Sequence, residues 1–151
     1  MNLKDFAVGR VLIIGVGNRE RGDDGVGPLV IDALSAEGFT NVLDVGTVPE
    51  NYTGTVIRYK PDTVLIIDAL SFGGEPGNWK LITPEECTEF GFSTHTASLS
   101  LFASYIKQWI PVTIYVLGVQ PKLVDFQADV SPDIKKSVSL LMNALKEIKR
   151  K

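Results

Sequence analysis

Apolar residues gather in short blocks along the chain, and each block predicts an element of structure. Three runs rich in β-branched residues, at positions 10–16, 63–69 and 112–118, are typical of strands buried on both faces. Weaker runs at 41–45 and 78–82 predict two more strands, the second of them at a sheet edge. The sequence therefore predicts about five strands.

Between these runs the apolar residues recur every three or four positions, which predicts helices. One helix is expected to begin near Val26, with Asp24 or Gly27 as its N-cap, and a weaker one spans positions 50–60. Another apolar helix face is formed by Leu99, Phe102, Ala103 and Ile106. In the C-terminal helix Ser131 is the expected N-cap, Pro132 the first residue, and the buried stripe is Ile134, Val138, Leu141, Leu145 and Ile148.

Strands that alternate with helices predict an α/β fold whose crossovers are right-handed. We expect a single domain over residues 1–151, built as three layers: a mostly parallel twisted sheet of about five strands, flanked by helices on both faces. The segment 71–77 contains three glycines and a proline, which excludes regular structure there.

Composition and charge narrow the class of protein. The chain has 151 residues, 44% hydrophobic and 22% charged, as globular proteins do, and its 15 basic against 18 acidic residues disfavour a nucleic acid or an anionic membrane as partner. One cysteine excludes an internal disulfide, and neither a membrane-spanning run nor a signal peptide is recognisable. We therefore expect a cytoplasmic protein without membrane insertion, and no exposed apolar stripe is evident that would demand more than a monomer.

Polar side chains converge where the predicted strands end. In parallel sheets the loops at the carboxyl ends of the strands face one crevice, and Asp23, Asp24, Asp68 and His95 all fall in such loops or strand ends. Two carboxylates and an imidazole suit a divalent metal such as zinc, nickel, manganese or iron. Three of these residues also have a structural alternative: Asp23 and Asp24 as helix caps, and His95 as an ordinary loop histidine.

Two other chemistries fit less well. A dinucleotide site needs glycine at the sixth position of the motif that Gly15 and Gly17 begin, where this chain has Glu20. A cysteine nucleophile needs a stabilised thiolate, yet Cys87 has Glu85, Glu86 and Glu89 as neighbours in sequence. A carboxylate-centred or metal-dependent site remains.

Several separated motifs together resemble one family. They are Gly15-Val-Gly-Asn-x4-Asp-Asp-Gly-Val-Gly-Pro28, Ile66-Ile-Asp-Ala69, Ser93-Thr-His95 and Val116-Leu-Gly-Val-Gln-Pro121. In order and spacing they resemble the hydrogenase maturation endopeptidases of [NiFe]-hydrogenases. Pro49-Glu-Asn51, Pro76-Gly77 and the segment 118–126 are most similar to the branch that serves formate hydrogenlyase-type hydrogenases, the hydrogenase 3 type.

The resemblance implies a function and a set of residues. Members of the family remove a C-terminal extension from the hydrogenase large-subunit precursor once nickel has been inserted. By motif, the metal-binding and catalytic positions correspond to Asp24, Asp68 and His95, and the residues expected to shape the cleft are Gly15, Gly17, Asn18 and Asp23. The first acidic position is glutamate in some branches. The nickel would be supplied by the substrate, so no permanent cofactor is expected.

Two mechanisms and two other functions stay open at this point. Substrate nickel could polarise the scissile carbonyl or a water while a carboxylate acts as base, or it could only position the peptide while Asp24 or Asp68 activates water. The chain could instead be a non-catalytic nickel-sensing or chaperone-like module. A dinucleotide-binding protein is the least supported alternative.

Overall fold

A five-stranded sheet forms the centre of the computed structural model, which describes residues 3–89 and 96–148. Its strand order is β2-β1-β3-β5-β4, in which β4 is antiparallel to β5 and every other pair is parallel. The strands are β1 (Val11–Gly15), β2 (Val42–Asp44), β3 (Thr63–Ala69), β4 (Trp79–Ile82) and β5 (Thr113–Val119). The predicted number of strands, their direction and the edge position of β4 are confirmed.

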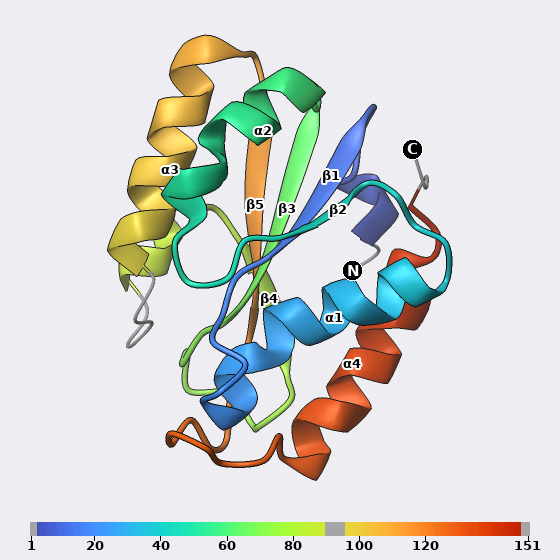
Figure 1. Cartoon of the computed structure of the whole chain (residues 1–151), viewed down its shortest axis with the longest axis vertical. Helices are drawn as coiled ribbons and strands as arrows, with labels where there is room; N and C mark the ends of the chain where they lie inside the picture. Colours follow the sequence, from blue (N-terminus) through green and yellow to red (C-terminus); the bar gives the residue numbers. More distant parts are fainter. Residues whose placement is uncertain (1–2, 90–95, 149–151) are drawn as a thin grey trace.

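Helices cover both faces of this sheet. Figure 1 shows α1 and α4 on one side of the strands and α2 and α3 on the other. The α-helices are α1 (Val26–Ala36), α2 (Thr53–Tyr59), α3 (Thr96–Trp109) and α4 (Pro132–Leu145), and short 3-10 helices are η1 (Leu3–Asp5), η2 (Gly22–Gly25), η3 (Pro49–Tyr52) and η4 (Glu86–Glu89). The predicted three-layer α/β fold is therefore confirmed.

The central strand β3 divides the apolar core into two halves. All seven of its residues are buried, and because side chains alternate along a strand, Leu65 and Ile67 pack with α1 and α4. Val64 and Ile66 pack with α2 and α3. By the same alternation Asp68 belongs to the α2–α3 face.

N-cap residues were predicted for two helices, and the structure confirms only one of them. Ser131 caps α4 and accepts a hydrogen bond from the Ile134 N–H at 3.4 Å, as expected. The prediction for α1 was wrong, because Gly25 is its N-cap and no side chain bonds there. The chain enters α1 through η2, which holds both Asp23 and Asp24 and aims their carboxylates elsewhere.

The surface of α3 differs from expectation. Its predicted core residues Leu99, Phe102, Ala103 and Ile106 are buried. However, Leu101, Tyr105 and Trp109 are 67%, 45% and 62% exposed, so the expectation that no apolar stripe would be exposed was wrong. Within the described ranges, none of the helices has the length and apolar character that a membrane span requires.

Candidate functional site

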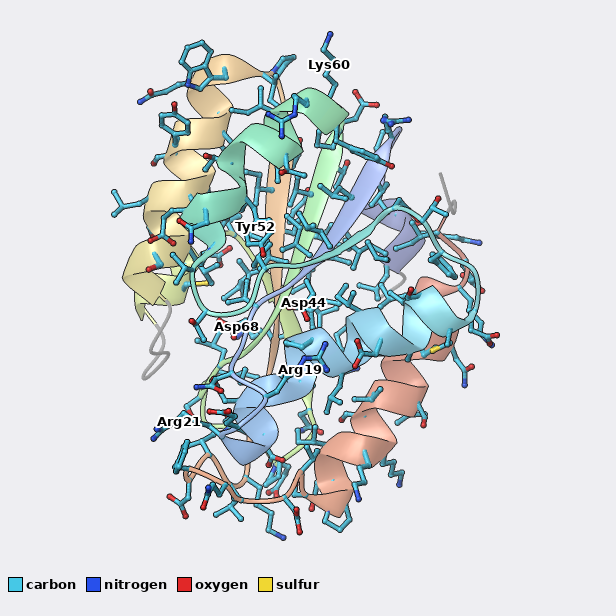
Figure 2. All side chains as sticks on the ribbon, viewed as in Figure 1. Arg19, Arg21, Asp44, Tyr52, Lys60 and Asp68 are labelled. Atoms are coloured by element: carbon cyan, nitrogen blue, oxygen red, sulfur yellow. The ribbon has the colours of Figure 1, made fainter. Side chains whose placement is uncertain are left out.

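The candidate site lies at the carboxyl edge of the sheet, where β1, β3 and β5 all end. The turn that follows β1 packs against β3, and the Val16 N–H donates to the Ile67 carbonyl at 2.9 Å. Figure 2 shows Asp68 in this part of the molecule, whereas Lys60, which precedes β3, lies at the opposite end of the strands. The structure therefore brings the turn that carries Asp24 and the strand end that carries Asp68 to one edge.

Close approach of backbones explains two glycines of the turn. A Cβ atom on Gly27 would collide with the carbonyl oxygens of Val16 and Ile67, and one on Gly15 would lie 2.6 Å from the Gly27 carbonyl oxygen. Glycine lets the start of α1 rest directly on the ends of β1 and β3. Gly15 thus sets the depth at which the turn sits over the sheet, and its part in shaping a cleft stays a prediction.

Asp24 is held by the turn that precedes it. Its side chain is mostly buried, with 9% of the residue exposed, and its Oδ2 accepts a hydrogen bond from the Asn18 N–H at 2.9 Å. A Cβ on Gly17 would collide with the Asp24 carbonyl oxygen. Asn18 also stabilises the turn, because its Oδ1 accepts from the Glu20 N–H at 2.9 Å. Gly17 and Asn18 therefore shape the backbone around Asp24.

The neighbouring Asp23 has a structural role. It is 0% exposed, and its two oxygens accept four hydrogen bonds. The donors are the Lys122 and Leu123 N–H groups at 2.9 and 3.0 Å, the Ser131 N–H at 2.7 Å and the Ser131 hydroxyl at 2.8 Å. Asp23 thus fastens the segment between β5 and α4 to the turn. Its carboxylate therefore supports the turn that carries Asp24, through bonds to the segment between β5 and α4.

Asp68 is the next-to-last residue of β3 and is 1% exposed. It lies opposite Gly118 of β5 and on the face covered by α2 and α3. Burial, and after it the negative charges of Asp68, Glu86 and Glu85, together raise the pKa of the nearby Cys87 thiol to about 12. The buried Cys87 is thus kept protonated, which agrees with the expectation that it is not a nucleophile.

Arg19 stabilises the turn after β1, a role that the sequence did not predict. Its guanidinium binds both oxygens of Asp32 on α1, at 2.6 and 2.9 Å, and Asp44 at the end of β2 at 2.7 Å. These hydrogen bonds raise the pKa of Arg19 and lower that of Asp32. The three labelled side chains Arg19, Asp44 and Asp68 lie in the same middle region of Figure 2. Arg19 therefore ties the turn to two further elements.

Gln120 is the second missed residue, although it lies in one of the motifs that carry the resemblance. Its Oε1 accepts from the Phe72 N–H at 2.8 Å and the Gly74 N–H at 3.2 Å, and its Nε2 donates to the Pro121 carbonyl at 3.3 Å. It thereby fixes the irregular loop that follows Asp68. A polar residue directly after a buried strand was the available signal.

His95 lies outside the described residues, so the structure does not place it. The helix α3 begins at the next residue, Thr96. It covers the face of the sheet to which Asp68 belongs. Among the residues with described positions, no three His, Cys, Asp or Glu side chains form a group that could hold a metal ion. The role of Asp24, Asp68 and His95 as one set stays a prediction.

The hydrogen bonding of the turn after β1 disfavours a dinucleotide site. In such a site the backbone N–H groups of the glycine-rich turn bind the pyrophosphate. Here the Asn18 N–H donates to the Asp24 carboxylate instead, which places negative charge where the ligand would carry its own. The turn is built to position a carboxylate, and such a group can ligate a cation or activate water.

Comparison with protein families gives a match over most of the chain. The family model described as HycI, hydrogenase maturation protease, matches residues 29–148. That range begins within α1 and extends past the end of α4; it includes Asp68 and His95, whereas Asp24 precedes it.

Individual relatives agree with this match. The hydrogenase 3 maturation protease of Escherichia coli K12 is 34% identical over 137 residues, which cover 89% of this chain and 87% of that protein. The crystal structure of the [NiFe] hydrogenase maturation protease HycI from Thermococcus kodakarensis superposes with a TM-score of 0.87 at 36% identity, over 97% of both chains. The solution structure of the Escherichia coli endopeptidase HycI gives 0.79 at 28% identity, over 89% of this chain and 88% of that one. The chain therefore belongs to the HycI family of hydrogenase maturation proteases and is a peptidase.

Proposed function

We propose that this chain removes the C-terminal extension of a [NiFe]-hydrogenase large-subunit precursor, of the hydrogenase 3 type, after nickel has been inserted. The proposal places the reaction in the cytoplasm, where the precursor would be assembled. The chain carries no permanent metal in this proposal, because the nickel arrives with the substrate.

One observation supports the proposal most directly: two carboxylates from separate elements occupy the carboxyl edge of the sheet. Asp24 is 9% exposed and Asp68 is 1% exposed. Neither residue occupies a helix-cap position, which removes the helix-cap alternative for Asp24. Carboxylates held out of bulk water are suited to bind a cation or to accept a proton from an attacking water.

The expected ligands Asp24, Asp68 and His95 suit weak, reversible binding of nickel that is held by another protein. Two carboxylate oxygens and one imidazole nitrogen are acceptable ligands for nickel and leave coordination positions open. A closed set of four protein ligands would hold the metal tightly and remove it from the product. With Asp24, Asp68 and His95 as an incomplete set, the nickel can stay with the hydrogenase.

Two routes to hydrolysis fit these residues. Substrate nickel can polarise the scissile carbonyl while Asp24 or Asp68 takes a proton from water. Alternatively, the metal only positions the peptide, and the carboxylates alone activate the water, as in paired-carboxylate enzymes. Both routes require an ionised carboxylate at this edge. Both predict the same loss when one is replaced by its amide.

The experiment compares cleavage of nickel-loaded and nickel-free precursor by mass spectrometry of the products. The unmodified chain should cleave only the loaded precursor, and Asp68→Asn and His95→Ala should each lower the rate by about 100-fold or more. Asp129→Asn is the matched control, because Asp129 is an exposed aspartate of the segment between β5 and α4. Its rate should be unchanged.

Other outcomes identify the alternatives. If neither precursor is cleaved but the loaded form binds tightly, the chain is a nickel-sensing module. Unchanged cleavage by both Asp68→Asn and His95→Ala would remove the proposed site. Tight binding of a nicotinamide nucleotide by the unmodified chain would favour the dinucleotide alternative instead.

A further inference from the structure

Exposed apolar side chains follow one side of α3. Leu101, Tyr105 and Trp109 are spaced four residues apart, so they form a single line along the helix. The rings of Tyr105 and Trp109 lie 6.2 Å apart between centroids. We call these three residues the α3 stripe. Large exposed aromatic residues in one line usually mark an interaction site.

A groove runs beside the α3 stripe. It has a volume of about 410 Å³ and lies between α3 and the segment formed by η3 and α2. The buried Phe102 is part of its lining, and Glu50 is the one charged residue among the lining residues, which are Glu50, Thr53, Leu101, Phe102, Ser104, Tyr105 and Gln108. The stripe and the groove therefore form one apolar surface with a weakly acidic side.

One end of this surface lies toward the carboxyl edge of the sheet. The helix α3 begins at Thr96, directly after the predicted site residue His95, and η3 follows β2 where that strand ends at the same edge. At 1.5 Å per residue, the stripe extends to about 20 Å from the first residue of α3. A protein bound at the site would reach the stripe, whereas a few residues around a scissile bond would not.

The extent of the surface favours a transient partner over a second copy of this chain. Three side chains on one helix expose on the order of a few hundred Å², whereas a stable dimer buries roughly 1,600 Å² in total. An enzyme must release its product, so a small patch with a few aromatic anchors suits a substrate protein.

We infer that the α3 stripe and its groove are a docking surface for the folded body of the hydrogenase large-subunit precursor, separate from the residues that cleave it. This inference rests on the proposed function. The partner surface that fits is apolar, with neutral or basic groups opposite Glu50. Docking there contributes to binding equally before and during the reaction, so its loss raises KM and leaves kcat unchanged.

The test is the triple variant Leu101→Ala, Tyr105→Ala and Trp109→Ala, assayed with nickel-loaded precursor. The KM should rise by about tenfold or more while kcat stays within twofold. Leu140→Ala is the matched control for Leu101→Ala, because Leu140 is 54% exposed but lies on α4, on the other face of the sheet. It should leave both constants unchanged, and circular dichroism should show that both proteins are folded.

The outcomes separate this inference from the proposed function. If the unmodified chain does not cleave loaded precursor, the proposed function fails. If it does cleave and the triple variant keeps its KM, only the docking surface is disproved. Light scattering at several protein concentrations tests whether a second copy of this chain binds the stripe instead. If the unmodified chain forms a dimer, and the triple variant is monomeric with an unchanged KM, the stripe serves self-association. A KM that rises as much in Leu140→Ala would also overturn the inference.

Discussion

Two neighbouring aspartates of η2 face different regions of the molecule and have different consequences. Asp23 faces the segment between β5 and α4, where four donors occupy its two oxygens. Asp24 faces the turn after β1 and accepts from the Asn18 N–H, at the edge of the sheet where β3 ends one residue after Asp68. Both are buried and both are acidic. Burial of a carboxylate therefore does not by itself identify a reactive group, whereas the segment that its hydrogen bonds hold in place is informative.

The largest effect should follow from Asp23→Ala. It leaves three backbone N–H groups and the Ser131 hydroxyl without their acceptor, so the free energy of unfolding should fall by about 3–5 kcal/mol. Urea denaturation measures this loss, and Asp129→Ala, in the same segment but exposed, should change stability by less than about 0.5 kcal/mol. An equal loss in both variants would remove the distinction between Asp23 and an ordinary surface aspartate.

The next effect is on activity. Asp24→Asn keeps the size of the side chain and an oxygen that can accept from the Asn18 N–H, so stability should change by about 1 kcal/mol or less. Cleavage of nickel-loaded precursor should fall by about 100-fold or more, because the charge is gone. Asp23→Asn is the reciprocal control, with lower stability but retained activity of the folded fraction. Retained activity in Asp24→Asn would contradict the division of roles.

A smaller effect is expected for Ser131→Ala. It removes one of the four bonds to Asp23 and the N-cap of α4, so stability should fall by about 1–2 kcal/mol. Ser139→Ala, on the exposed side of the same helix, is the control and should be nearly neutral. No loss in Ser131→Ala would mean that backbone donors alone hold the Asp23 carboxylate.

The smallest effect concerns the thiol of Cys87, whose pKa is raised to about 12 by burial and by the charge of Asp68. Asp68→Asn should lower that pKa, and Asp23→Asn should not, as the pH dependence of alkylation would show. The shift also affects stability, because the unfolded thiol ionises near its ordinary pKa of 9.0 while the folded one does not. Stability should therefore decrease as pH rises from about 9 toward 12. Equal alkylation profiles of all three proteins would exclude the effect of Asp68.

The fold could be predicted from the sequence because its elements carry local signals. The run 63–69 is β3 with the same bounds, and the Ser131-Pro132 pair marks the start of α4. The roles of Asp23 and Gln120 could not be predicted, because their partners lie about 100 and nearly 50 residues away in the chain. The exposed stripe was also missed. Leu101, Tyr105 and Trp109 interleave with core residues on α3, and periodicity does not reveal how wide the buried face is.

The four hydrogen bonds of Asp23 have a consequence for local opening of the chain. They join the start of α4 to the turn that holds Asp24, although the two are separated by most of the sequence. When that turn opens, the amides of Lys122, Leu123 and Ser131 lose their acceptor at the same moment. Hydrogen exchange at these positions should follow one shared opening free energy, as one cooperative unit. Any motion that frees Asp24 from its surroundings would then also loosen the first turn of the C-terminal helix.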